Sequence, residues 1–266
     1  MKTTDPSPTA LITGASSGIG YELTKLLAGD RYNLVLVARS ESKLKQIASE
    51  LTKQFGITVK VISKDLSSPT SPKEIWQELQ TESITIDVLV NNAGFATYGL
   101  FTETELQPEL NMMQLNMVTL THLTKLFLPE MLARQAGKIL NVASTAAFQP
   151  GPLMAVYYAT KAYVLSFSEA VANELQGTGV SVSALCPGPT ASGFQARANM
   201  ENSKLVKNKQ IMDAKQVASI GYRGLMNNQA VVIPGWQNKL LTLVVRFTPR
   251  NLVTRIVRNM QEKAER

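Results

Sequence analysis

The feature of this sequence that most constrains its fold is the alternation of short apolar runs with segments of helical periodicity. The apolar runs lie at residues 10–13, 34–38, 59–62, 88–90, 138–142 and 180–185. Between them, hydrophobic residues recur at helical spacing in the segments 19–28, 42–55, 72–82, 107–133 and 156–175. Leu34 to Ala38 is apolar throughout, as expected for a strand covered on both faces. The alternation predicts an α/β fold, a parallel sheet with helices on both faces and right-handed crossovers.

The turn between the first apolar run and the first helical segment is rich in glycine, and it reads Thr13-Gly14-Ala15-Ser16-Ser17-Gly18-Ile19-Gly20. Gly14 can take a tight turn, Gly18 lets the backbone approach a pyrophosphate, and Gly20 permits close packing of helix on sheet. Free N–H groups at a helix start also favour a bound anion. The turn therefore predicts a doubly wound Rossmann fold and a dinucleotide site that includes Ser16, Ser17 and Ile19.

Four motifs in order resemble those of the short-chain dehydrogenase/reductase family. They are TGASSGIG at residues 13–20, Asn91-Asn92-Ala93-Gly94, Ser144 with Tyr157 and Lys161, and Pro187-Gly188. They are similar to the family's TGxxxGxG, NNAG, Ser…YxxxK and PG elements, and the resemblance covers roughly residues 9–192. In layout the chain resembles the subgroup with ketoacyl and hydroxysteroid reductases. The resemblance implies a nicotinamide cofactor bound in part by Asn92, Ala93, Gly94, Pro187 and Gly188.

The end of the second predicted strand favours NADP(H) over NAD. NAD-specific sites usually place an acid here to bind the ribose 2′-hydroxyl, but residues 37–40 contain none. Arg39 can pair with a 2′-phosphate through its planar fork, and Ser40 can add a hydroxyl. A solvated surface arginine is the alternative. Asp65 and Leu66 resemble a family pair that lies near adenine, with a capping aspartate as the alternative.

Tyr157 and Lys161 are four residues apart, so a helix places them on one face. A free tyrosine has a pKa of about 10, too high for proton transfer at neutral pH. A nearby cation lowers that pKa, so Tyr157 could give a proton to a carbonyl oxygen or take one from an alcohol. Ser144 could hydrogen-bond the same oxygen. Tyr158 does not fit the YxxxK spacing, and we expect it to pack or to line the pocket.

The resemblance also implies roles for residues that spacing alone does not identify. Asn116 resembles the family's fourth catalytic residue, which holds a water that feeds protons to the lysine; a solvent-facing asparagine is the alternative. Lys161 is implied to bind the nicotinamide ribose as well. Thr190 and Ser192 are both candidates for the nicotinamide carboxamide, and the sequence leaves the choice between them open.

We predict a single domain over residues 1–266, with a core at 9–192, a substrate lid region at 193–229 and an amphipathic basic extension at 236–266. The lid is expected because a long irregular segment after a strand often covers an active site, with a disordered surface loop as the alternative. Apolar residues near the expected pocket predict a hydrophobic carbonyl or alcohol substrate. They are Phe95, Tyr98, Phe101, Phe148, Leu153 and Phe194.

The composition excludes several other classes of protein. The net charge is +7, of which +5 lies after residue 234, so the nearly neutral body does not favour nucleic-acid binding. A single cysteine, Cys186, excludes an internal disulfide, and no acidic or histidine cluster predicts a metal site. His122 is the only histidine and no GxSxG motif accompanies it, so a hydrolase triad is not supported. No secretory signal and no run of about 20 apolar residues is present, which favours a cytoplasmic protein.

The C-terminal segments 238–247 and 251–263 have helical patterns, the first apolar and the second basic. We favour packing across the substrate cleft or against a partner subunit, because apolar faces in soluble chains usually face protein. The alternative is a peripheral contact with an anionic membrane surface. The whole pattern predicts an NADP(H)-dependent oxidoreductase, assembled by family resemblance as a homodimer or homotetramer. A cofactor-binding regulator without turnover, or a membrane-surface protein acting through its tail, are the alternatives.

Overall fold

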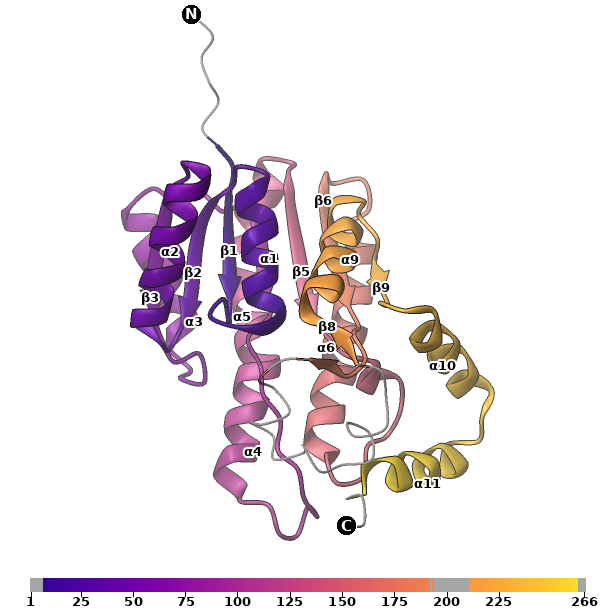
Figure 1. The fold of residues 1–266 in the computed structure, drawn as a ribbon. Coiled ribbons are helices and arrows are strands. Elements are labelled where there is room, and N and C mark those ends of the chain that lie inside the picture. The colour runs from indigo at the N-terminus through magenta and orange to yellow at the C-terminus, as the bar shows by residue number, and fades with distance from the viewer. Residues whose placement is uncertain (1–6, 192, 194–210, 263–266) are drawn as a thin grey trace, which may run out of the picture.

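The protein is a doubly wound α/β domain in the computed structural model, which describes residues 7–191, 193 and 211–262 (Figure 1). Seven parallel strands form the main sheet in the order β3-β2-β1-β4-β5-β6-β9. Their bounds are β1 Thr9–Thr13, β2 Asn33–Ala38, β3 Val59–Ser63, β4 Val88–Asn91, β5 Gly137–Val142, β6 Val180–Leu185 and β9 Val231–Val232. A parallel pair, β7 (Thr190–Ala191) and β8 (Met212–Asp213), lies apart from it. The predicted fold class is confirmed.

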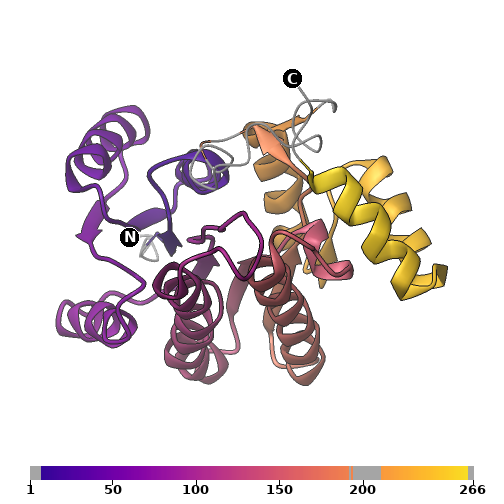
Figure 2. The ribbon, with the colours of Figure 1, turned by 90° about the horizontal axis from the view of Figure 1, so that it is seen from below.

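Helices cover both faces of the main sheet (Figures 1 and 2). One face carries α1 (Gly18–Gly29), α2 (Glu41–Phe55) and α9 (Ala214–Met226). The other carries α3 (Ser71–Thr81), α5 (Leu120–Ala133) and α6 (Ala155–Glu174). A helix α4 (Leu106–Met113) and a π-helical segment η1 (Gln114–Thr119) lead into α5, and a 3₁₀ turn η2 (Thr145–Phe148) follows β5.

A hydrophobic core on each face of the main sheet explains why the strand sequences are continuous apolar runs. In β2, Leu34 and Leu36 pack into the core under α1, whereas Val35 and Val37 pack into the core under α3 and α5. Successive side chains of a strand point to opposite faces, so a strand with helices on both sides needs apolar residues at every position.

The region 193–229 does not form one lid. Its residues 214–226 are helix α9, in which Val217, Ala218 and Leu225 are fully buried in the core under α1. The lid prediction is wrong for this part, and residues 194–210 lie outside the described residues. Gly221 and Gly224 weaken the helical pattern in the sequence, because glycine has low helix propensity. In the structure a Cβ at Gly221 would lie 2.7 Å from the Leu185 side chain, so this glycine lets the helix approach the sheet.

Two helices extend the domain beyond β9, α10 (Trp236–Phe247) and α11 (Arg250–Gln261) (Figure 1). Val253 and Val257 of α11 are buried in one cluster with Met154, Tyr157 and Tyr158. The C-terminal extension therefore packs beside the end of α6 that carries the predicted catalytic tyrosine. Among the described helices, none is long and apolar enough to cross a membrane.

We expect Leu225→Ala in α9 to lower the free energy of unfolding by about 2–5 kcal/mol, because it removes a fully buried side chain and leaves a cavity. Leu243→Ala, at a half-exposed position of α10, is the matched control and should change it by no more than about 0.5 kcal/mol. Urea denaturation measures both. Equal midpoints for Leu225→Ala and the wild type would mean that α9 is not part of the cooperative core.

Candidate active site

A cavity of about 370 Å³ opens at the carboxyl ends of the strands, in the crevice between the turns that follow β1 and β4. The strand order reverses at β1 and β4, and a crevice at such a point is where open α/β sheets bind ligands. Most of the predicted site residues line it: Gly14, Ser16, Ser17, Gly18, Ile19, Arg39, Ser40, Asp65, Leu66, Asn92, Ala93, Gly94, Ser144, Tyr157, Lys161, Pro187, Gly188 and Thr190. Gly20 and Asn116 do not line it, and Ser192 lies outside the described residues.

The glycine-rich turn has the geometry that its sequence predicts. Gly14 has a φ of 67° and Gly18 a φ of 57°, a left-handed conformation that favours glycine. A Cβ on Gly20 would lie 2.5 Å from the carbonyl oxygen of Gly14, so only glycine fits there. Helix α1 begins at Gly18 with no acidic side chain in its first turn. Because Gly18 and Ile19 line the cavity, the positive end of α1 faces it and can bind an anion.

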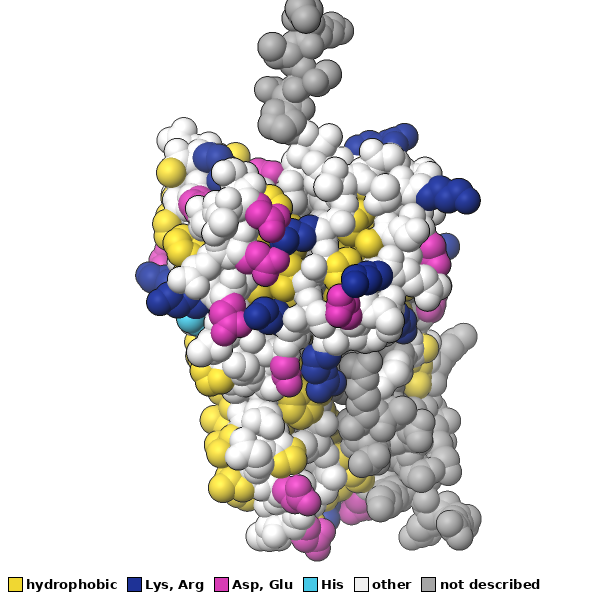
Figure 3. Space-filling view, turned by 90° about the vertical axis from the view of Figure 1, so that its left-hand side faces the viewer, with side chains coloured by type: hydrophobic (Ala, Val, Ile, Leu, Met, Phe, Trp, Pro, Cys, Tyr) yellow, Lys and Arg dark blue, Asp and Glu magenta, His cyan; other side chains and the backbone are white. Residues whose placement is uncertain are grey.

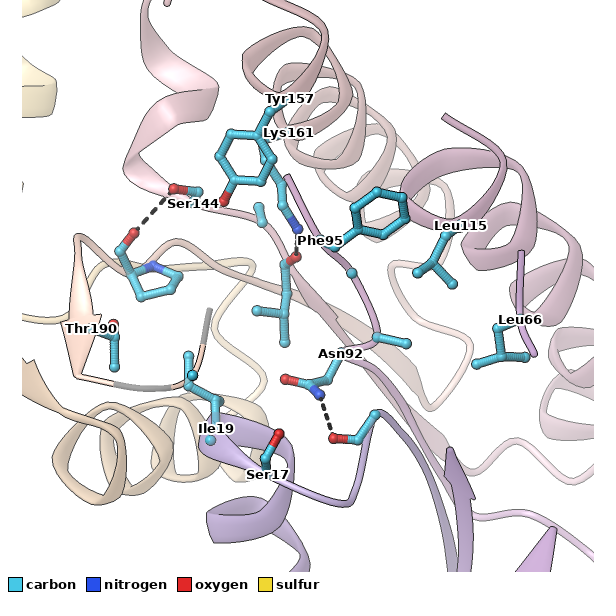
Figure 4. A pocket seen from close by; sticks show the side chains of 18 of the residues that line it. Ser17, Ile19, Leu66, Asn92, Phe95, Leu115, Ser144, Tyr157, Lys161 and Thr190 are labelled. Carbon is cyan, nitrogen blue, oxygen red and sulfur yellow. Dashed lines mark hydrogen bonds between the residues drawn. The ribbon is translucent and has the colours of Figure 1, made fainter. Parts of the chain in front are cut away.

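Thr13 and Asn92 tie this turn to the one after β4. The Thr13 hydroxyl donates to the carbonyl of Val90 at 3.1 Å and accepts from the backbone N–H groups of Asn92 and Ala93 at 2.9 and 3.0 Å. The Asn92 amide donates back to the carbonyl of Thr13 at 2.9 Å (Figure 4 shows Asn92 in the cavity wall). The two halves of the site are thus fixed to each other.

One end of the cavity carries charged side chains of both signs. Arg39 and Ser40 are exposed there, and Lys64, which the sequence analysis did not single out, lines the same end and forms an ion pair with Glu74 at 2.7 Å. Asp65 accepts hydrogen bonds from the N–H and hydroxyl of Ser67, which hold the pKa of its carboxyl below the ordinary value, with the charge of Arg39 adding to the effect. Asp65 therefore caps a turn, and its place near adenine stays a prediction.

The other end of the cavity brings together Tyr157, Lys161 and Ser144. Tyr157 and Lys161 are nearly buried on α6, and Ser144 follows β5. Figure 4 shows the Tyr157 phenol pointing toward Ser144, with the Lys161 side chain beside it. The Lys161 ammonium lies 5.8 Å from the centre of the Tyr157 ring and donates to the carbonyl of Val142 at 2.8 Å.

Burial controls the ionisation of both groups. It raises the pKa of Tyr157 to about 12, against a smaller lowering by a hydrogen bond with Ser144. It lowers the pKa of Lys161 to about 8. The sequence led us to expect a lowered tyrosine pKa, and the structure shows the opposite direction. The physical reason is that removing the phenolate from water outweighs the favourable interactions around it.

Asn116 is buried and lies behind the cavity wall, which excludes the solvent-facing alternative. Its amide nitrogen donates to the carbonyl of Phe95 and to the hydroxyl of Thr160, both at 3.1 Å, and its oxygen accepts from the N–H of Phe95 at 3.3 Å. The Thr160 hydroxyl in turn donates to the carbonyl of Tyr157 at 2.7 Å. Asn116 thus connects the loop after β4 to the turn of α6 that carries the tyrosine; its water-holding role stays a prediction.

Ser144 joins the turn after β5 to the turn after β6. Its hydroxyl accepts from the N–H of Ala146 at 3.1 Å and donates to the carbonyl of Pro187 at 3.3 Å. Thr190 also lines the cavity, and its hydroxyl donates to the carbonyl of Gly188 at 2.9 Å. Because Ser192 is not among the described residues, the choice between Thr190 and Ser192 stays open.

The apolar wall differs from the one expected. Of the six predicted residues only Phe95 lines the cavity; Tyr98, Phe101, Phe148 and Leu153 do not, and Phe194 lies outside the described residues. The wall includes instead Leu115, Met154 and Tyr158. Proximity to a loop in sequence does not reveal which way a side chain points, and Met154 reaches the cavity only because η2 and α6 fold toward it. Tyr158 lines the cavity as the sequence predicted.

The residues that were expected to play no chemical part lie away from the reactive end or are packed. Cys186 is fully buried. The histidine, His122, is at the surface (Figure 3, cyan). The face in Figure 3 mixes basic and acidic side chains rather than showing a basic stripe. Within the described ranges no group of histidine, cysteine and acidic residues could hold a metal ion.

Comparison with known proteins gives consistent matches. The family model for short chain dehydrogenases matches residues 8–203. The chain is similar to the ketoacyl reductase HetN of Nostoc, at 32% identity over 96% of this chain and 90% of that protein. It is also similar to the very-long-chain 3-oxoacyl-CoA reductase of Pyrenophora tritici-repentis, at 32% identity over 97% and 77% of the two chains. Among solved structures, a short-chain dehydrogenase from Sphingobium yanoikuyae in complex with NADPH matches with a TM-score of 0.81 and 30% identity, over 90% and 93%.

The lowered pKa of Lys161 predicts a pH-dependent stability. Between about pH 8 and 10.5 the unfolded chain still holds the proton that the folded protein has released, so stability rises with pH across this window. Relative to Lys161→Met, which lacks the group, the wild type should gain up to about 3 kcal/mol in free energy of unfolding between these limits.

Denaturation at a series of pH values tests this, with Lys125→Met at an exposed position of α5 as the control. The difference in the free energy of unfolding between the wild type and Lys125→Met should stay constant between about pH 8 and 10.5. A flat difference between wild type and Lys161→Met would show that the ammonium is not desolvated.

Proposed function

Because the chain belongs to the short-chain dehydrogenase family and is an oxidoreductase acting between alcohol and carbonyl groups, we propose that it reduces a hydrophobic carbonyl compound with NADPH. The observation that carries the proposal is a single cavity with Arg39 and Ser40 at one end and Tyr157 and Ser144 at the other. The end with Arg39 can select the cofactor, and the end with Tyr157 can donate a proton to the reacting oxygen or accept one from it.

The residues present fit a nicotinamide dinucleotide. The positive end of α1 and the glycines of the first turn suit a pyrophosphate, because no Cβ stands at Gly14 or Gly18. Asn92, Ala93 and Gly94 line the middle of the cavity, and Lys161 and Thr190 lie within reach of the reactive end. When bound, the cofactor supplies or accepts the hydride of the reaction.

A preference for NADP(H) is supported by charge. Arg39 lies at the end where a 2′-phosphate would lie and can bind it with two parallel hydrogen bonds, whereas Lys64 at the same end is paired with Glu74. Asp65, an acid at this end, is already engaged by Ser67. The similar Sphingobium yanoikuyae protein has a structure with NADPH.

In the proposed reaction, Tyr157 gives its proton to the carbonyl oxygen of the substrate. A pKa of about 12 keeps the phenol protonated at neutral pH, which is the form that reduction requires. The Ser144 hydroxyl turns from the carbonyl of Pro187 to donate a hydrogen bond to the same oxygen, and so stabilises the charge that develops on it. Lys161, which donates to the carbonyl of Val142, lowers the free-energy cost of the phenolate that Tyr157 becomes. Asn116 positions Tyr157 through Thr160.

A hydrophobic substrate is supported by the wall around this group, which contains Phe95, Met154 and Tyr158. The similar proteins are named for ketoacyl and 3-oxoacyl-CoA reduction. We therefore propose 3-oxoacyl thioesters, followed by bulky ketones, as the first compounds to assay. Assembly as a homodimer or homotetramer and a cytoplasmic location are further parts of the proposal.

We expect Arg39→Ala to weaken NADPH binding by about 10- to 100-fold, since it removes a charge-assisted hydrogen-bonding partner of the 2′-phosphate. NADH binding should change by less than about threefold, because NADH has no phosphate there. Titration of each cofactor followed by nicotinamide fluorescence measures both. Equal losses for the two cofactors would remove the NADP(H) assignment.

Tyr157→Phe should lower kcat for carbonyl reduction by about 10²- to 10⁴-fold, because it deletes the proton donor. NADPH affinity should stay within about threefold of wild type, since the ring remains in place. Tyr158→Phe is the control, because it removes the neighbouring phenol that lines the same cavity. If Tyr158→Phe lost as much activity as Tyr157→Phe, the assignment of the proton donor would be wrong.

A further inference from the structure

Helix α10 turns a continuous apolar face away from the protein. This face consists of five residues that follow one another at steps of four, three, one and three, which places them on one side of the helix. They are Trp236, Leu240, Leu243, Val244 and Phe247. All five are exposed, from 50% at Val244 to 82% at Phe247. Apolar residues of a surface helix normally face the core, so this arrangement is the reverse of the usual one.

The opposite side of α10 is already in use. Thr242 is buried, Val245 packs against the cluster that contains Tyr157, and the Asn238 amide donates to the carbonyl of Pro234 at 2.7 Å. Asn238 is also the nearest side chain to Gly188 in the cavity wall. The helix is thus anchored by its inner side and cannot rotate to bury the apolar face without breaking these contacts.

The surroundings of the apolar face are basic. On α10, Lys239 and Arg246 lie beside the apolar face. The whole segment 236–262 contains five basic residues and one acidic residue, Glu262. Arg258 forms an ion pair with that acid at 3.6 Å. Figures 1 and 2 show α10 and α11 at the rim of the molecule, beyond β9 and clear of the helix layers. The face of α10 is thus apolar with one cationic edge, because Lys239 and Arg246 are seven residues apart and lie on the same side of the helix.

We propose that α10 docks on the surface of an anionic phospholipid membrane, with Trp236 and Phe247 at the boundary of headgroups and acyl chains. Lys239 and Arg246 then lie at the level of the lipid phosphates. Tryptophan favours this interfacial depth because its ring is amphipathic. A second copy fits less well, because a two-fold contact through this face would bring the basic edges of both copies together.

Docking would also place the cavity close to the bilayer. The inner side of α10 approaches Gly188 and η2, which border the cavity. A hydrophobic substrate dissolved in the membrane would then have a short path to Tyr157. This path rests on the proposed function, whereas the docking itself does not, and vesicle binding measures docking alone.

The first experiment follows Trp236 itself. The chain has two tryptophans, and Trp76 on α3 is half-buried far from α10 in sequence, so Trp76→Phe leaves Trp236 as the single reporter. Vesicles of phosphatidylcholine with about 30% phosphatidylserine should shift its emission to the blue, and pure phosphatidylcholine should shift it less. An emission spectrum that neither vesicle changes would overturn the proposal.

The second experiment is co-sedimentation of the full chain with the same vesicles. Trp236→Ser with Phe247→Ser should lower binding by about tenfold or more. Leu106→Ser with Leu132→Ser, at exposed positions of α4 and α5, is the control and should bind like wild type. Lys239→Gln with Arg246→Gln should lower binding roughly tenfold for the anionic vesicles alone.

Reductase activity on a water-soluble ketone and the oligomeric state should be the same in the α10 variants and in wild type. If Trp236→Ser with Phe247→Ser instead converted an oligomer to monomers, the face would belong to a second copy and the proposal would fall. Wild-type binding that ignores lipid charge would contradict the role of the basic edge.

Discussion

The contact between the turns after β1 and β4 is the constraint on which the site depends. These strands are neighbours from which the chain crosses to opposite faces of the sheet, so their turns diverge and leave a crevice. The Thr13 hydroxyl bridges the two turns with three hydrogen bonds, and the Asn92 amide adds two more, to the carbonyls of Thr13 and Gly14. Each is worth only about 1 kcal/mol net, but buried polar groups without partners would cost more. The contact therefore fixes the two turns that border the crevice relative to each other.

A second polar network sets α6 against the sheet. The Asn91 amide donates to the Asn141 oxygen at 2.9 Å and to the Thr124 hydroxyl at 3.2 Å, and the Asn141 amide donates to the Ser168 hydroxyl at 2.9 Å. These side chains are almost fully buried, so the network links β4, β5, α5 and α6 in a region of low dielectric. With the bond of Asn116 to Thr160, α6 is held within the turn that carries Tyr157 and Lys161, and again at Ser168, about two turns further along. Such positioning lets Lys161 remain buried despite its charge.

The C-terminal extension has an inner side that packs on the protein and an outer side that is exposed. On its inner side, Val253 and Val257 of α11 complete the cluster around Tyr157 and Tyr158, and the Tyr98 hydroxyl donates to the carbonyl of Gln261 at 2.6 Å. On its outer side, α10 presents the face that we assign to a lipid surface. The packing and membrane alternatives for this segment are thus compatible, because they involve different sides of the extension.

The sequence by itself determined the layers of the fold, the glycine-rich turn and the group Ser144, Tyr157 and Lys161. The layers, the turn and the pairing of Tyr157 with Lys161 follow from local rules: strand and helix periodicity, glycine conformation and the four-residue spacing on a helix. Ser144 joins the group through the resemblance to the family's motif. The tertiary structure decided what depends on surroundings. Burial set the direction of the Tyr157 pKa, packing made α9 a core helix, and folding brought Met154 and Lys64 to the cavity. Desolvation and side-chain direction arise from residues distant in sequence, and so no local pattern encodes them.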